Sequence, residues 1–584
     1  MISNTGRFVI TFNGEIYNFL ELRSILAEKG ASFSGGSDTE VILAAFECWG
    51  IIESLKRFIG MFAFVVWDRQ KQKVYLARDR IGEKPLYYGW IGDVFVFASE
   101  LKALCAYSDW NGEINRDALC LYMRHNYIPA PFSIYKNINK LLPATLMEFQ
   151  PSNRNQVFRE YWSARDCIRT NHASTPPADE REYIEQFEHL MKQCLSQKLI
   201  ADVPVGAFLS GGIDSSTVVS LMQSVSNNNV NTYTIGFHES SFNEAVTAKK
   251  TAQHLGTNHT ELYVTPQEAM AVIPELPAIY DEPFADSSQI PTYLVSEMTR
   301  RYVTVALSGD GGDELFGGYN RYFYVRSLWN KFNMIPKPLR AVSRDIVRNI
   351  SPGAWNRIYK CFTPFLPKSQ RHRQPGNGIH KLADAWVTFD PDDLYFNLIS
   401  HWKEPEYTVL NAREPVSRLN ILMESAEDLD FTERMMFWDL LTYLPDDILT
   451  KVDRASMAVS LEARVPFLDH RIVEFAWSLP FDMKVRNNAG KYLLRKVLER
   501  YVPAKIFDGP KMGFAIPLAE WLRGPLSGWC EELLDDKVLE EDGFFYPPFI
   551  HKIWNEHKHR KKEWHYYLWN ILMFQAWNRS IKNS

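Results

Sequence analysis

Residues suited to holding phosphate gather in one short stretch, Ser210–Ser216, which reads Ser-Gly-Gly-Ile-Asp-Ser-Ser. Val203–Leu209 before it is predicted to be a buried strand, and Thr217–Met222 after it carries apolar residues at the spacing of one helix face. Hydroxyl and backbone N–H groups at a helix start can bind phosphate oxygens, and the helix dipole favours the anion. Asp214 would repel a phosphate, so a divalent cation, Mg²⁺, is expected between them. The stretch predicts a pyrophosphate-binding loop; the alternative is a simple turn with a serine helix cap.

A second glycine-rich, acidic stretch, Ser308–Glu314, follows the predicted buried strand Val303–Leu307. In an open parallel sheet, ligands bind outside the carboxyl ends of the strands, so both loops are expected at one site. Neither loop matches the Gly-x-x-x-x-Gly-Lys-Ser/Thr or the Gly-x-Gly-x-x-Gly pattern. This disfavours both ordinary γ-phosphate transfer and dinucleotide binding.

The elements that must position these loops change in kind along the chain. Residues 1–150 contain short alternating runs typical of antiparallel strands, with amphipathic helices at 21–30 and 39–49, which predicts an α+β layer. Residues 151–180 are polar and rich in proline and are predicted to be a linker. From 181 to 584, helices alternate with strands and then predominate, which predicts an α/β doubly wound parallel sheet with a helical C-terminal part.

Composition limits the class of protein. The chain has 584 residues, 46% of them hydrophobic, which is enough for sizeable cores. Its apolar runs fall far short of the roughly 18 residues that span a bilayer, and Met1–Arg7 lacks the features of a signal peptide, so a cytoplasmic protein without a membrane partner is expected. Seven dispersed cysteines argue against a disulfide framework or a structural zinc site. A net charge of -5 gives no reason to expect a nucleic-acid partner.

Beyond the two loops, an ordered set of motifs resembles the glutamine-dependent asparagine synthetases. In that family an N-terminal Ntn-type glutaminase, an antiparallel sandwich, is joined to a synthetase of the ATP-pyrophosphatase type. The resemblance covers nearly the whole chain and rests, besides the loops, on residues 12–18, 37–40, 60–64, 78–88, 98–102, 461–469 and 511–514. It implies a glutamine amidotransferase domain at 1–150 and an asparagine synthetase domain at 181–584.

The resemblance implies that ATP and aspartate form β-aspartyl-AMP and pyrophosphate, after which ammonia gives asparagine and AMP. Asp214 and Asp313 would ligate Mg²⁺, Asp310 would support formation of the acyl-adenylate, and Lys511 would stabilise charge developing on the phosphate. The implied ATP-binding residues are Leu209, Ser210, Gly211, Gly212, Asp214, Ser215, Ser216, Ile235, Ser308 and Gly309. Outside this setting, Leu209 and Ile235 would be ordinary core residues and Lys511 an ordinary surface lysine.

The chain departs from the family pattern at its amino terminus. The family nucleophile is an N-terminal cysteine activated by its own α-amino group, whereas this chain begins Met1–Ile2–Ser3. We therefore expect the glutaminase domain to be N-terminally incomplete, either as a missing start or as a real chain that uses free ammonia, and we predict activity with ammonium but not glutamine. The remaining glutamine-pocket residues would be Asn13, Gly14, Glu15 and Asp38.

Other interpretations stay open at this point. An amidotransferase for another carboxylate, such as a uronic acid or a peptide side chain, would share every ATP residue, and a non-catalytic relative would keep the scaffold alone. Arg464 fits either a functional role or a buried ion pair. Asp281–Ser288 fits either recognition of the acceptor or its metal, or a capped turn. The resemblance also implies a homodimer.

Overall fold

The computed structural model describes the chain except for residues 173–178, 238–243, 335–389, 427, 510–515 and 584. Its N-terminal part contains a five-stranded antiparallel sheet in the order β1-β2-β3-β7-β8. A three-stranded antiparallel sheet in the order β5-β4-β6 accompanies it. These strands are β1 (Phe8–Ile16), β2 (Gly60–Asp68), β3 (Lys73–Arg78), β4 (Tyr87–Ile91), β5 (Val94–Ala98), β6 (Ile138–Lys140), β7 (Thr145–Gln150) and β8 (Asn155–Glu160).

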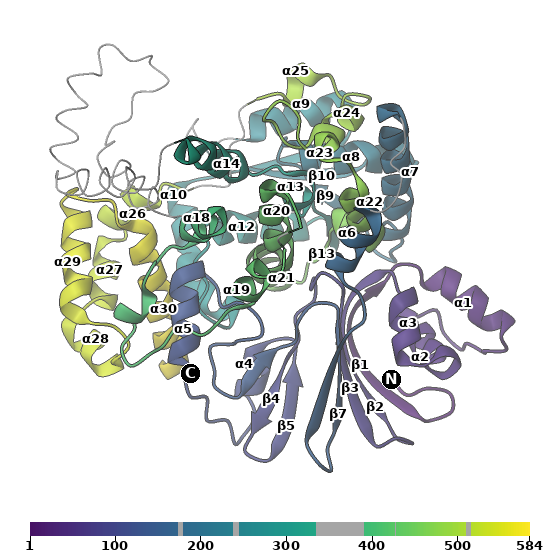
Figure 1. The fold of residues 1–584 in the computed structure, drawn as a ribbon, viewed down its shortest axis with the longest axis horizontal. Coiled ribbons are helices and arrows are strands. Elements are labelled where there is room, and N and C mark those ends of the chain that lie inside the picture. The colour runs from purple at the N-terminus through teal and green to yellow at the C-terminus, as the bar shows by residue number, and fades with distance from the viewer. Residues whose placement is uncertain (173–178, 238–243, 335–389, 427, 510–515, 584) are drawn as a thin grey trace.

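Alternating side chains of β2 explain how the larger sheet is covered on both faces. Phe62 and Phe64 pack with the helices α1 (Phe19–Glu28), α2 (Asp38–Trp49) and α3 (Ile51–Arg57). Ala63 and Val65 point the other way and pack with Tyr88 of the smaller sheet. The predicted antiparallel strands and both predicted helices are confirmed, and the two sheets form a sandwich (Figure 1).

The segment 151–180 is not the plain linker that its composition suggested. β8 pairs with β7 from Thr145↔Glu160 to Gln150↔Asn155, so the first sheet extends into this segment. The helix α6 (Ala164–His172) follows and packs on α22 (His470–Ser478). Polar composition misled the prediction because β8 is an edge strand whose side chains are mostly exposed.

All pairings in the second large sheet are parallel, and its order is β11-β10-β9-β12-β13. Its strands are β9 (Val205–Phe208), β10 (Asn231–Phe237), β11 (Asn258–Val264), β12 (Val305–Leu307) and β13 (Glu462–Arg464). The chain adds strands outward from β9 to β11 and then returns to place β12 on the other side of β9. This reversal between β9 and β12 is a topological switch point, where ligands bind in open α/β sheets.

Helices cover both faces of the parallel sheet, which confirms the doubly wound prediction. Ala207 and Leu209 pack with α7 (Glu180–Lys198) and α8 (Ile213–Val225), while Tyr233 and Ala306 pack in a separate core with α12 (Gln289–Arg300). The other helices that frame the site are α9 (Ala245–Leu255), α13 (Gly312–Phe316), α14 (Asn320–Asn333), α18 (Pro391–Ile399), α19 (Arg418–Met423), α20 (Phe431–Leu441), α21 (Thr450–Met457), α23 (Phe481–Lys484), α24 (Tyr492–Leu498) and α25 (Ala504–Phe507).

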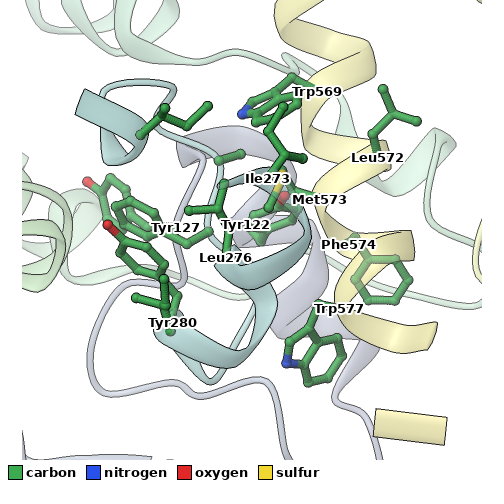
Figure 2. Close-up of a cluster of buried hydrophobic side chains, with 14 of the residues drawn as sticks. Tyr122, Tyr127, Ile273, Leu276, Tyr280, Trp569, Leu572, Met573, Phe574 and Trp577 are labelled. Atoms are coloured by element: carbon green, nitrogen blue, oxygen red, sulfur yellow. The ribbon is translucent and has the colours of Figure 1, made fainter. Parts of the chain in front are cut away.

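The C-terminal helices bind the two parts of the chain together. α30 (His565–Asn583) packs against α5 (Arg116–His125) of the N-terminal part and α11 (Leu276–Tyr280) of the C-terminal part, as Figure 2 shows for Trp569, Phe574 and Tyr122. Tyr122 Oη donates to the Asn570 carbonyl at 2.7 Å, which satisfies its buried hydroxyl. Neighbouring helices are α4 (Leu101–Cys105), α10 (Pro266–Ala271), α26 (Leu518–Arg523), α27 (Ser527–Leu533), α28 (Asp536–Asp542) and α29 (Pro547–Lys558). Within the described ranges, no helix has the length and apolar character to cross a membrane.

Candidate active site

The loop Ser210–Ser216 joins β9 to α8 as a compact turn. Gly211 has φ +77°, a backbone conformation that favours glycine. Ser210 N–H donates to Ser215 Oγ at 3.2 Å, and the two serine hydroxyls lie 2.9 Å apart. Gly212 is the N-cap of α8, and no side chain caps this helix. The serine-cap alternative is therefore not what the structure shows, and the start of α8 presents its positive dipole end beside the loop.

The second loop packs directly on the first. A Cβ atom added to Gly309 would lie 2.7 Å from the backbone nitrogen of Ser215, and one added to Gly312 would lie 2.5 Å from Asp214 Oδ1. Both glycines are required by this close approach. The expectation that the two loops meet at one site is confirmed.

Asp214 and Asp313, one from each loop, converge on the ammonium group of Lys491. Lys491 Nζ forms an ion pair with Asp214 Oδ2 and lies 2.7 Å from Asp313 Oδ1. Its side chain is only 7% exposed. Burial opposes the charge of Lys491, but the two carboxylates outweigh it and raise the pKa of Lys491 above its ordinary value. The two carboxylates that share the Lys491 ammonium group also supply oxygen ligands of the kind that Mg²⁺ requires.

Sequence reasoning missed Lys491. The residue precedes α24 with φ 62°, and its N–H donates to the Phe316 carbonyl at 2.8 Å, which directs the side chain back toward the second loop. Lys491 lies 277 positions from Asp214, so no local spacing could connect them. The only local signal was a glycine, Gly490, whose Cβ position falls 1.9 Å from the Gly317 carbonyl oxygen.

Asp310 belongs to the second loop and is partly exposed. Ser308 Oγ donates to Asp310 Oδ2. Burial raises the pKa of Asp310, although the Ser308 hydrogen bond and the charge of Lys451 oppose the shift. Lys451 in turn forms an ion pair with Asp286 at 2.6 Å. Asp310 is therefore linked through Lys451 to the segment Asp281–Ser288.

Three predicted site residues receive no separate support from geometry. Leu209 and Ile235 are 1% and 3% exposed and pack in hydrophobic cores, as the simpler reading of these residues required. Lys511 lies outside the described residues. Their roles toward ATP stay predictions.

The four predicted glutamine-pocket residues lie on β1 and the first turn of α2. Asp38 Oδ2 accepts from Ile16 N–H at 3.0 Å, and Asn13 Nδ2 donates to Ser99 Oγ at 3.1 Å. Burial and the nearby acidic groups Glu462 and Asp38 raise the pKa of Glu15 to about 7. A Cβ on Gly14 would lie 2.1 Å from the Met61 carbonyl oxygen, so strand pairing alone explains this glycine. The four residues are close together, and their role in binding glutamine stays a prediction.

Five of the described thiols lie in surroundings that disfavour the thiolate. Burial raises the pKa of Cys105, Cys120, Cys167, Cys194 and Cys530, whereas a nucleophilic cysteine needs a lowered pKa. Cys361 lies outside the described residues.

The two motifs whose roles were open have clear structural partners. Arg464 pairs with Glu462 at 2.6 Å and donates to the carbonyls of Lys198 and Ile200, so it fastens the edge strand β13. Asp286 closes a turn by accepting from Ser288 N–H at 2.9 Å, and it also lines a cavity of about 700 Å³. Asp281–Ser288 thus combines the capped turn with a position beside a cavity.

Sequence comparison relates both parts of the chain to known proteins. A sequence model described as asparagine synthase matches residues 186–579, and one described as a glutamine amidotransferase domain matches residues 1–162. Asparagine synthetase (glutamine-hydrolyzing) 1 of Bacillus subtilis (strain 168) is 32% identical over 97% of this chain and 85% of its own. Asparagine synthetase (glutamine-hydrolyzing) 3 of the same strain is 28% identical over 91% and 81%. Amidase chry2 of Gibberella zeae is 27% identical over 91% and 80%.

The first match spans well over half of the chain, and the second covers the antiparallel sandwich together with β8, which composition had assigned to a linker. The two glycine loops at the switch point lie within the matched synthase region, as do Asp310 and Lys491. This chain belongs to the asparagine synthase family of ATP-dependent ligases and carries a glutamine amidotransferase domain at its N-terminal end.

Proposed function

We propose that this protein amidates aspartate to asparagine, with ATP cleaved to AMP and pyrophosphate through a β-aspartyl-AMP intermediate. The observation that carries the proposal is the convergence of Asp214 and Asp313 on one cation, between two glycine loops at the switch point of a parallel sheet. Aspartate is proposed because two of the relatives above are named asparagine synthetases.

The residues of the two loops suit cleavage between the α- and β-phosphates. Serine hydroxyls and N–H groups at the start of α8 can hold the departing pyrophosphate, because they are hydrogen-bond donors at the positive end of the helix dipole. Asp214 and Asp313 would hold Mg²⁺, which supplies charge neutralisation to the phosphates when bound. Lys491, now paired with both carboxylates, is placed to donate to a phosphate oxygen of the same group.

In the first step an oxygen of the acceptor carboxylate attacks the α-phosphorus, and the bond to the β-phosphate breaks with release of pyrophosphate. In the second step ammonia attacks the acyl carbon, the bond to AMP breaks, and one proton leaves the nitrogen. Asp310 in the second loop feels the charge of Lys451, which pairs with Asp286 on the cavity wall, and the acyl group would meet ammonia beside these residues. Leu209, Ile235 and Lys511 are proposed to contact the nucleotide.

Formation of AMP, pyrophosphate and asparagine from ATP, aspartate and a nitrogen donor tests the proposal. We expect Asp310→Asn to lower the rate by about 100-fold, the scale of one proton-transfer or electrostatic group. Gly528→Ala, where an added Cβ meets nothing within 4 Å, is the control that retains activity. Release of ADP and phosphate in place of AMP and pyrophosphate would contradict the proposal.

The nitrogen donor is a separate part of the proposal. We propose that a polypeptide of this sequence uses ammonium, because burial raises the pKa of five of its thiols and so disfavours a thiolate nucleophile. Asparagine formation with ammonium and with glutamine, compared at equal concentrations, tests this. Equal rates with glutamine would refute it while leaving the synthetase proposal intact.

A further inference from the structure

A cavity of about 700 Å³ lies beside the second glycine loop and has wall residues from both the N-terminal and the C-terminal part of the chain. Asp286 on its wall pairs with Lys451, whose charge acts on Asp310 in that loop. Arg321 on the same wall lies in the first turn of α14, which begins at Asn320 shortly after the loop. The cavity therefore adjoins the place where the acceptor is proposed to react with ATP.

Two tyrosine rings and a carboxylate hold the guanidinium group of Arg321 in one orientation. Its carbon Cζ lies 4.2 Å from the centre of the Tyr319 ring and 4.6 Å from that of Tyr443. Its Nη2 atom donates to Asp439 Oδ2 at 2.6 Å. Its Nε atom is buried without a hydrogen-bond partner in the part of the chain that the structure describes. A guanidinium group fixed in this way loses little freedom when it binds a ligand.

Asp439 has other donors besides Arg321. Tyr322 Oη donates to its Oδ2 atom and Tyr395 Oη to its Oδ1 atom, each at 2.6 Å. The Asp439 side chain is 2% exposed, whereas that of Arg321 is 25% exposed and lines the cavity. A buried N–H group without an acceptor costs free energy until a ligand supplies one. A carboxylate suits a guanidinium group best, because it can accept from two of its N–H groups at once.

Asp447 supplies the opposite charge on the same wall. It belongs to the π-helical turn η6 (Leu444–Leu449), and such turns are frequent at functional sites. Its Oδ1 atom is buried and has no hydrogen-bond partner among the described residues. Burial and the charge of Asp286 raise the pKa of Asp447. Arg321 is close enough to oppose this shift in pKa, and an ammonium group beside Oδ1 would oppose it in the same way.

We propose that Arg321 binds the α-carboxylate of aspartate and that Asp447 binds its α-ammonium group. A guanidinium group and a carboxylate on one wall match the zwitterionic end of an amino acid, whose two charges would otherwise lose water without compensation. The β-carboxylate is then left to face the two glycine loops. The pair selects an amino acid over acceptors of similar length that lack either charge. This inference rests on the proposed function for its reaction, but the binding of aspartate can be measured without that reaction.

Two analogues of aspartate each remove one of the two charges and keep the carboxylate that reacts. L-isoasparagine carries an amide in place of the α-carboxylate, and succinate lacks the α-ammonium group. Pyrophosphate release with Mg-ATP and ammonium gives kcat/KM for aspartate and for each analogue. We expect the original chain to prefer aspartate over both analogues by about tenfold or more, the scale of one hydrogen-bonded charge.

Each of two variants should abolish one of these preferences and keep the other. Arg321→Gln should lower kcat/KM by about tenfold or more for aspartate and succinate, with little change for L-isoasparagine. Asp447→Asn should lower it by a similar factor for aspartate and L-isoasparagine, with little change for succinate. Arg326→Gln is the matched control and should leave all three values unchanged. Arg326 lies on the same helix and pairs with Asp430 at 2.6 Å, but it is not part of the cavity wall.

A purely structural role of the two residues would give a different result. It would lower kcat/KM for all three acceptors by the same factor, and this outcome would overturn the assignment while leaving the amidation proposal standing. The preferences of the original chain need no variant. Equal kcat/KM values for the three acceptors would therefore overturn the assignment even if a variant did not fold.

Binding of L-aspartate without ATP is measured in parallel by saturation-transfer NMR. Binding that is retained in Arg326→Gln and lost in Arg321→Gln, without pyrophosphate release from any acceptor, would support the aspartate site and refute the proposed function. Absence of both binding and turnover of aspartate in the original chain would overturn both proposals.

Discussion

Replacing Lys491 by methionine tests the assignment of Asp214 and Asp313 as a cation site. The substitution keeps most of the side-chain volume but leaves two carboxylates facing each other without their shared ammonium group. Removing one partner of a buried ion pair costs about 3–5 kcal/mol. The two carboxylates retain 17% and 18% exposure, so we expect a loss of unfolding free energy near the lower end, about 3 kcal/mol.

Magnesium should reverse this loss in the variant and not in the original chain. With the lysine removed, Mg²⁺ can occupy the place between the carboxylates, and at about 100 times its Kd it would return about 2.7 kcal/mol. In the original chain the ammonium group competes for the same oxygens, so Mg²⁺ without ATP should change stability little. Urea unfolding followed by fluorescence, with and without Mg²⁺, measures both effects.

Lys451→Met provides the matched control. Lys451 is also buried and paired with an aspartate, Asp286, but this carboxylate is not one of the predicted metal ligands. The control should lose stability without recovery by Mg²⁺. Equal stabilisation of all three proteins by Mg²⁺, or an unchanged urea midpoint for Lys491→Met, would refute the cation-site reasoning.

Three further predictions follow from close approach, protonation and packing. Gly309→Ala should lower the rate of pyrophosphate release more than tenfold, because the added Cβ would lie 2.7 Å from the Ser215 nitrogen. The control Gly509→Ala should retain the rate, because its added Cβ meets nothing within 4 Å. Similar rates in the two variants would contradict the contact between the loops. Burial raises the pKa of Glu83 from 4.5 to about 7, so the folded state holds a proton that the unfolded state releases. This contribution to stability is present below pH 4.5 and is lost as the pH rises to about 7. In thermal unfolding scans, Glu83→Gln should therefore show a smaller decrease in Tm between pH 5 and pH 8 than the original chain. An equal decrease in both proteins would count against this assignment. Trp577→Ala should cost about 3–5 kcal/mol in urea unfolding, because Trp577 is 1% exposed in the core of Figure 2, and a loss below 1 kcal/mol would show that the site collapses around the gap.

Local pattern was sufficient for much of the fold. Period-two alternation predicted the strands of the sandwich, and strand, glycine turn and helix in sequence predicted the β9–α8 unit. The rule that ligands bind outside the carboxyl ends of parallel strands correctly predicted that Ser210–Ser216 and Ser308–Glu314 lie close together. The edge strand β8 was missed because most of its side chains are exposed and it lies within a segment whose polar composition resembled a linker.

The sequence by itself determined the chemistry available to this protein, because residue types in the two glycine loops restrict what can bind beside a helix start. It could not show that Lys491, 277 positions from Asp214, lies between the two carboxylates, since a positive φ and a hydrogen bond to Phe316 place it there. Nor could it show the cavity, whose wall joins His125, Arg321 and Tyr566 from three distant segments. Only tertiary structure brings such residues together, because ion pairing and enclosed volume depend on distance in space and not on position along the chain.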